Sequence, residues 1–191
     1  MELTELIKEK LDKARENGAL PLIVSVDGHA AAGKTTLAGK LYEAFGCSVI
    51  RTDDFFLPKE LRTEERLSEP GGNVHYERFA EEVLPFIRSG KPFTYGVFDC
   101  SVMGINGEKQ IMPSELIIVE GSYSQHPFFG DYADITVFCD ISTEEQMRRV
   151  TLRNGKEKAE VFRKKWIPLE NAYFEAFCIK EKAEVICSAL R

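Results

Sequence analysis

The sequence of 191 residues contains no hydrophobic run long enough to cross a membrane. A transmembrane helix needs about 20 consecutive apolar residues, whereas the longest apolar stretches, such as Leu116 to Val119, have the length of a strand. The first 17 residues place acidic and basic side chains around a helical apolar stripe, which is typical of neither a signal peptide nor a transit peptide. We therefore expect a cytoplasmic protein without a membrane partner.

The sequence also lacks paired cysteines and an excess of positive charge. Its five cysteines include no C-x-x-C pair, which predicts reduced thiols rather than a disulfide framework or a zinc site. The formal net charge of −6 argues against a general nucleic-acid binder, because such binding rests on basic residues that neutralise phosphates. One segment differs, since eight basic and two acidic side chains lie between Arg148 and Lys165. We expect this segment to meet an anion.

What the sequence does contain is an alternation of short apolar runs with amphipathic helices, which predicts an α/β protein with a mostly parallel sheet covered on both faces. A small antiparallel hairpin appended to that sheet is expected over about 91–113, where aromatic alternation is followed by the turn signal Asn106-Gly107. We expect one domain over residues 1–191. The expected strands are 22–26, 48–52, 116–119, 135–138 and 183–187, and the expected helices are 1–17, 34–45, 76–87, 143–153 and 158–177, the last with a break or kink at Pro168.

The most informative segment follows the first expected strand. Gly28 to Thr35 fits G-x-x-x-x-G-K-[ST] between a strand and a helix, which is the pattern of a phosphate-binding loop. Backbone N–H groups of such a loop surround a phosphate, Lys34 reaches the terminal phosphates, and the Thr35 hydroxyl binds magnesium. This predicts the three-layer sandwich of P-loop NTPases. The residues expected at the nucleotide are Gly28, His29, Ala30, Ala31, Ala32, Gly33, Lys34, Thr35 and Thr36.

Acidic residues end two other expected strands. Asp53 and Asp54 follow the second strand, so that a carboxylate beside the phosphate loop could accept a hydroxyl proton and orient the hydroxyl for attack on a γ-phosphate. Glu120 ends the strand 116–119 and could hold magnesium directly or through water. The alternative is that all three are solvated turn residues. The phosphate loop favours the functional interpretation.

Taken together, these motifs resemble uridine kinase and its relatives among the P-loop nucleoside kinases, including phosphoribulokinase-like enzymes. The resemblance runs from about Leu22 to Ile186. It rests on the phosphate loop, Thr52-Asp53-Asp54-Phe55-Phe56, Val119-Glu120-Gly121, Arg148-Arg149-Val150 with Arg153, and Lys182-Ala183-Glu184-Val185-Ile186. It implies a small-molecule kinase that uses ATP and Mg²⁺, with a helical lid at about 148–165.

The same resemblance implies roles for individual residues. Asp53 rather than Asp54 would contact the acceptor hydroxyl, and Glu120 would serve magnesium together with Thr35 and Asp53. Lys34, Asp53, Arg149 and Arg153 form the expected catalytic set, and Arg148 joins Arg149 at ATP. The residues expected at the acceptor are Asp53, Phe55, Phe56, His75, Tyr76 and Phe98.

Three departures from the family pattern concern the acceptor. His75 stands where uridine kinases carry an acid for the ribose hydroxyls, and the position of their base-reading histidine falls near Met103. The lid is also shorter, since Arg153 is soon followed by the next expected helix. We therefore expect an enzyme that is not a strict uridine or cytidine kinase, because strong discrimination needs buried polar groups placed for one substrate.

Two classes of function remain open. The first is an ATP-dependent kinase that phosphorylates a hydroxyl of a nucleoside or of another metabolite. The second is a nucleotide-binding switch or regulatory ATPase. The base-reading N-K-x-D motif and the D-x-x-G of GTP switches are absent, as is the signature of ABC-type ATPases, so the sequence favours the kinase. A homo-oligomer is compatible with the sequence.

Overall fold

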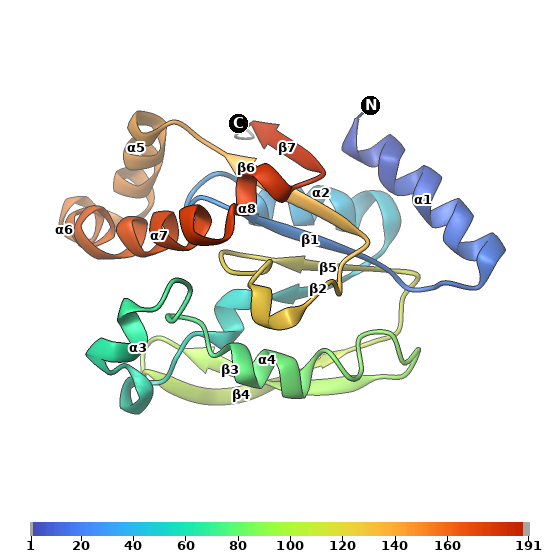
Figure 1. The fold of residues 1–191 in the computed structure, drawn as a ribbon, viewed down its shortest axis with the longest axis horizontal. Helices are drawn as coiled ribbons and strands as arrows, with labels where there is room; N and C mark the ends of the chain where they lie inside the picture. The colour runs from blue at the N-terminus through green and yellow to red at the C-terminus, as the bar shows by residue number, and fades with distance from the viewer. Residues whose placement is uncertain (1, 189–191) are drawn as a thin grey trace.

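The computed structural model describes residues 2–188 and contains a parallel five-stranded sheet and a separate two-stranded hairpin (Figure 1). The sheet has the order β2-β5-β1-β6-β7, and all of its strands run parallel. The strands are β1 (Leu22–Gly28), β2 (Ser48–Arg51), β5 (Leu116–Glu120), β6 (Ile135–Asp140) and β7 (Val185–Ser188). The expected α/β fold class with a mostly parallel sheet is confirmed.

Two apolar layers hold the sheet between helices. On one face, α1 (Leu3–Asn17) and α2 (Lys34–Phe45) pack on alternate residues of the strands, such as Val24 and Ile118. On the other face, Ile23 and Val119 pack among side chains of α4 (Tyr76–Glu82), α7 (Ile167–Phe177) and α8 (Ile179–Lys182). The central strands β1 and β5 are buried along their whole length, as expected for parallel strands covered on both faces.

The helix expected over 76–87 is shorter in the structure. Regular α4 ends at Glu82, and residues 83–88 continue as turns. Pro85 explains the difference, because it lacks the N–H that a helix requires and disfavours a helical residue before it. The apolar side chains of this stretch, Val83 and Ile87, are nevertheless buried. The apolar pattern therefore predicted burial correctly, but the predicted length of the helix was wrong.

The hairpin also differs in two respects. Strands β3 (Phe93–Asp99) and β4 (Gly104–Ile111) form a sheet of their own instead of joining the main sheet, and Asn106-Gly107 lies inside β4. The turn is at residues 100–103. Asp99 places it there, because its carboxylate accepts hydrogen bonds from the Ser101 N–H at 2.7 Å and from the Asn106 side chain at 3.0 Å.

The C-terminal helical region starts earlier than expected and has an irregular centre. Helix α5 (Thr143–Asn154) is followed by α6 (Lys156–Val161), a π-helical segment (Phe162–Trp166) and α7. A wider turn directly before Pro168 accommodates a residue that cannot donate the usual helical hydrogen bond. Short helices α3 (Glu64–Ser68) and α8 and the 3-10 turns Thr52–Phe55, Lys59–Leu61 and Pro127–Phe129 complete the described chain.

None of the helices among residues 2–188 is both long and apolar enough to span a bilayer.

Candidate functional site

The carboxyl ends of β1, β5 and β2 meet at one edge of the sheet, where open parallel sheets bind their ligands. The phosphate loop begins at Gly28, whose φ of 131° and close approach to β6 exclude a side chain: a Cβ there would collide with the Cys139 carbonyl oxygen. Gly33, with φ 101°, precedes the first turn of α2. The N-terminus of α2 therefore points its free N–H groups into the loop.

Lys34 is the buried cation of this edge. Its ammonium group donates to the carbonyl oxygens of Gly28 at 2.6 Å and His29 at 2.9 Å, and to the Ser122 hydroxyl at 3.2 Å. Three acceptors thus satisfy its three N–H groups without a carboxylate in direct contact. The positive charge stays available to an anion in the loop.

Two carboxylates, Glu120 and Asp53, lie beside the loop. Glu120, which is buried, accepts a hydrogen bond from the Thr35 hydroxyl, with its two oxygens at 3.2 and 3.3 Å. Burial raises its pKa, and the negative charge of Asp53 raises it further. Oxygen donors of this kind suit Mg²⁺, which is usually held by one or two carboxylates together with substrate phosphates and water. Among residues 2–188, no group of three or more His, Cys, Asp or Glu side chains could hold a metal alone.

Asp53 and its neighbour Asp54 have different surroundings. Asp54 accepts a hydrogen bond from the Tyr95 hydroxyl at 2.9 Å and lies 3.9 Å from the Lys109 ammonium, so it ties the hairpin to this region. Asp53 faces the cleft and keeps contact with solvent. The protein around it still removes enough water to raise its pKa, while Lys34 lowers it and Asp54 raises it. Of the two acids, Asp53 alone is a free proton acceptor in the cleft.

A close contact between β2 and β5 sets these positions. The Thr52 hydroxyl donates to the carbonyl oxygens at the end of β5, at 3.3 Å to Glu120 and 2.9 Å to Ser122. Gly121, with φ 131°, leaves room for this contact, because a Cβ there would overlap the Thr52 hydroxyl. The sequence pattern Val119-Glu120-Gly121 therefore places Glu120 and Asp53 on the same side of the loop.

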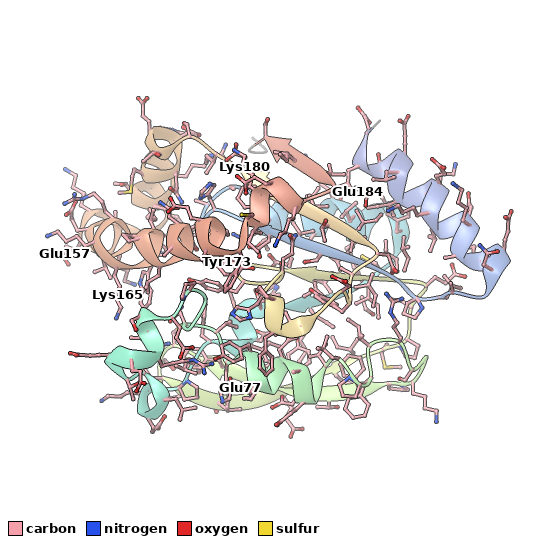
Figure 2. All side chains as sticks on the ribbon, in the orientation of Figure 1. Glu77, Glu157, Lys165, Tyr173, Lys180 and Glu184 are labelled. Carbon is pink, nitrogen blue, oxygen red and sulfur yellow. The ribbon has the colours of Figure 1, made fainter. Side chains whose placement is uncertain are left out.

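The loop, the acids and the helical region that follows β6 enclose a cleft of about 400 Å³. From this helical region, Arg149 and Arg153 of α5 and Phe162 of the π-helical segment line the cleft. Figure 2 shows Glu157 and Lys165 at the outer end of this helical region and Tyr173 of α7 near the middle of the molecule. Of the expected residues, those that line the cleft are Ala30, Ala31, Gly33, Lys34, Thr35, Thr36, Asp53, Phe56, Glu120, Arg149 and Arg153.

Several expected residues lie outside this cleft. Arg148 is exposed and pairs with Glu145 at 2.6 Å. The His29 ring packs edge-on against Phe138 and Phe174, with Nε2 3.5 Å from Asp140, so only its backbone belongs to the loop. The structure therefore does not bring these two side chains to the cleft.

The expected acceptor residues are divided between the cleft, the core and a neighbouring cavity. Phe56 lines the cleft and Phe55 is buried in the core. His75 caps α4, lies 3.1 Å from Glu77, and lines a separate cavity of about 270 Å³. Tyr76 stacks on His126 with ring centroids 4.7 Å apart, and Phe98 contacts the Phe56 ring edge-on at 6.2 Å.

Sequence reasoning missed two buried acids that hold the loop. Glu170 of α7 accepts from the Ala30 N–H at 3.0 Å and from the Ser122 hydroxyl at 2.8 Å. Asp27 accepts from the N–H groups of Gly28, Tyr123 and Gln125 and from the Tyr173 hydroxyl. Burial raises the pKa of both. Asp27 stood beside the motif as a polar residue in an apolar strand, whereas nothing local marked Glu170.

Comparison with known proteins gives a consistent family likeness. No family model matches the sequence. A uridine kinase of Chlamydia pneumoniae is 28% identical over 151 residues, which are 74% of this chain and 67% of that enzyme. The resemblance expected from the motifs is confirmed, and the chain is uridine kinase-like.

Two solved structures show the fold. One from Bacillus stearothermophilus, described as a uridine kinase candidate, has a TM-score of 0.64 at 18% identity and covers 94% of this chain and 98% of its own. The other, from Silicibacter sp. TM1040 and described as a candidate fructose transport system kinase, has a TM-score of 0.70 at 20% identity and covers 98% and 99%. The expected three-layer P-loop fold is confirmed.

Proposed function

We propose that this protein is an ATP- and Mg²⁺-dependent kinase that transfers the γ-phosphoryl group to a hydroxyl of a small molecule, as its uridine kinase-like sequence suggests. One observation carries the proposal: the cation Lys34, the hydroxyl–carboxylate pair Thr35 and Glu120, and the free carboxylate of Asp53 line one cleft. These are the groups that phosphoryl transfer needs, since its catalysis consists mainly of positioning and charge stabilisation.

The transfer itself assigns one role to each group. The acceptor oxygen attacks the γ-phosphorus, its proton passes to the Asp53 carboxylate, and the bond from the γ-phosphorus to the bridging oxygen breaks to release ADP. Lys34 and the loop N–H groups bind the phosphates, and Arg149 and Arg153 face the growing charge from the lid. Because burial raises its pKa, Asp53 is a stronger base than an ordinary aspartate.

Thr35 and Glu120, with Asp53 opposite, would hold Mg²⁺ through oxygen ligands. The ion, when bound, neutralises charge on the phosphates. Its positive charge would also offset the negative charge of Asp53, which adds to burial in raising the pKa of Glu120.

A regulatory ATPase or nucleotide-binding switch is the alternative. The free carboxylate beside the phosphate loop favours the kinase, because a group that accepts a proton from an alcohol is needed for transfer but not for a switch. Steady-state ADP release with and without a panel of nucleosides, sugars and sugar phosphates separates the two. Turnover that depends on an acceptor, with a phosphorylated product seen by mass spectrometry, supports the kinase; slow turnover that no acceptor changes contradicts it.

The same panel tests selectivity. We propose that the enzyme is not a strict pyrimidine nucleoside kinase, since His75 lines a separate cavity and pairs with Glu77. Met103 lies in the hairpin turn, where its carbonyl oxygen accepts the Lys59 N–H. A preference for uridine above about 10³ in kcat/KM over every other compound would refute this selectivity proposal.

A further inference from the structure

The arginines of this acidic protein are almost all neutralised by a neighbouring carboxylate. Eight of those among residues 2–188 have a side-chain nitrogen within 4.0 Å of a carboxylate oxygen: Arg15, Arg51, Arg66, Arg78, Arg88, Arg148, Arg149 and Arg163. Within the described chain, Arg62 and Arg153 have no such partner. Because the chain has 31 acidic residues against 25 basic ones, an arginine without an acid needs an explanation.

Both unpaired arginines contact the same π-helical segment. The Arg153 guanidinium lies 5.9 Å from the centre of the Phe162 ring, and the Arg62 guanidinium lies 5.9 Å from the centre of the Trp166 ring. Phe162 and Trp166 are the first and last residues of that segment. Arg153 and Phe162 line the cleft, whereas Arg62 contacts Trp166, about one helical turn from Phe162 in the same segment.

The surroundings of Arg62 hold its charge in place without neutralising it. Aromatic rings approach it from two other segments, Phe98 of the hairpin at 5.6 Å and Trp166 of the lid, and its Nε donates to the Leu57 carbonyl oxygen at 2.6 Å. Its side chain is half-buried, and burial lowers its pKa. Partial loss of water without an opposite charge is unfavourable, and a bound anion would reverse it.

Phe98 and Phe56 connect this arginine to the proposed reaction centre. The Phe98 ring touches the Phe56 ring, and Phe56 lines the cleft together with Asp53. A molecule whose hydroxyl lies at Asp53 and whose body extends along Phe56 would meet the Arg62 guanidinium at its other end. Carboxylate and phosphate groups both match the planar donors of a guanidinium.

We propose that the phosphoryl acceptor of this enzyme carries an anionic group, a carboxylate or a phosphate, which Arg62 binds at the rim of the cleft. The inference rests on the proposed kinase function and narrows it to acceptors that a neutral nucleoside does not represent. Arg153 is unpaired because it meets the nucleotide, and Arg62 is unpaired because it meets the acceptor.

The test compares pairs of alcohols. In each pair, one compound is neutral and the other carries an additional anionic group. Ribose with ribose 5-phosphate probes a phosphate, panthenol with pantothenate probes a carboxylate, and uridine serves as the neutral nucleoside. We expect kcat/KM for at least one charged member to exceed that of its neutral partner at least tenfold. Arg62→Gln should abolish that preference through KM while it leaves the KM of MgATP within twofold.

Arg163→Gln is the matched control, because Arg163 is an exposed arginine of the π-helical segment that pairs with Glu160 three residues before it. It should keep the preference. A second measurement needs no turnover: calorimetric titration of the MgADP-loaded protein with the same pairs should show at least tenfold tighter binding of a charged member, lost in Arg62→Gln.

Outcomes against the inference are distinct from failure of the proposed function. Phosphorylation of uridine and the other neutral alcohols in preference to the charged ones contradicts the role of Arg62 and leaves the kinase intact. Equal losses for neutral and charged acceptors in Arg62→Gln would make the residue a mechanical contact between hairpin and lid, which also overturns it. If no compound is phosphorylated, the kinase proposal fails, and equal binding of both members of each pair then refutes the anion site.

Discussion

Two regions of the molecule treat charge differently. In the sheet half, residues 22–53 and 114–188, carbonyl and hydroxyl oxygens hold the buried Lys34. Asp53 and Glu120 face the cleft, and the exposed Arg51 lies 3.6 Å from Glu120. In the hairpin half, residues 54–113, every arginine except Arg62 lies within 4.0 Å of a carboxylate. Arg66 makes a two-pronged pair with Glu77, and Arg78 makes another with Glu82.

The unpaired charges belong to the proposed reaction site, whereas the paired charges connect structural elements. Paired charges in the hairpin half connect short helices and a two-stranded sheet, which also pack on the main core through buried residues such as Phe55, Phe79 and Tyr95. Unpaired charges in the sheet half remain costly until a ligand supplies the opposite charge. Substitutions in the sheet half should therefore affect catalysis most, and those in the hairpin half should affect stability or acceptor choice.

The largest expected effect is that of Lys34→Ala. We expect phosphoryl transfer to fall by about three orders of magnitude or more, because this is the lysine that the phosphate loop directs at the β- and γ-phosphates. The measurement is kcat at saturating ATP. Lys40→Ala, an exposed lysine of the same helix, is the control and should stay near wild type. Near-normal turnover of Lys34→Ala would contradict the assignment of the phosphate loop.

Asp53→Asn should separate binding from chemistry. We expect kcat to fall by about 10² or more while MgATP affinity, measured by calorimetry, stays within a few-fold, since the amide keeps the shape but accepts no proton. Asp54→Asn is the comparison across the boundary between the two halves. It weakens the contact with Tyr95 and should lower thermal stability more than kcat. A larger loss of kcat in Asp54→Asn would reverse the choice between the two acids.

The junction of the two halves should make the protein sensitive to mild acid. His126 is buried between Tyr76 and Tyr173, and burial lowers its pKa from 6.5 to about 4. Below pH 6.5 the unfolded chain binds a proton that the folded chain excludes, so stability falls as the pH drops from about 6.5 to about 4. The whole interval corresponds to about 3 kcal/mol.

Denaturant unfolding of wild type and His126→Phe at several pH values measures this contribution. The variant keeps an aromatic ring without a titrating group, so the difference in free energy of unfolding between the two proteins should change with pH in that window. A difference that is constant between pH 7 and pH 4 would contradict the assigned role.

The smallest effect should come from the lid. Arg153→Gln is expected to lower kcat about tenfold, since its unpaired guanidinium lines the cleft and faces the transferred charge. Arg148→Gln should cost less, because Arg148 pairs with Glu145 outside the cleft. Initial rates at saturating substrates give both values, with thermal melting as the control for folding. The opposite order would place Arg148 at the nucleotide when the lid closes.

The sequence by itself determined the features that depend on a local pattern of residues. The phosphate loop and α2, the runs of β1 and β5, and the acids that end β2 and β5 were predicted closely, because each depends on a few neighbouring residues. Parallel strands then bring their carboxyl ends to one edge, so Lys34, Thr35, Asp53 and Glu120 could be expected together before any contact was known.

Tertiary structure decided what depends on partners far along the chain. Glu170 reaches Ala30 across 140 positions, and Ser122 reaches Lys34 across 88, so no window of sequence reveals either contact. Two local predictions also failed because of nearby residues. Hydrogen bonds to Asp99 place the hairpin turn at residues 100–103 instead of at Asn106-Gly107, and Pro85 ends α4 before Ile87. Whether a charge is paired depends on three-dimensional packing, and for that reason only the structure distinguished Arg62 and Arg153 from the other arginines.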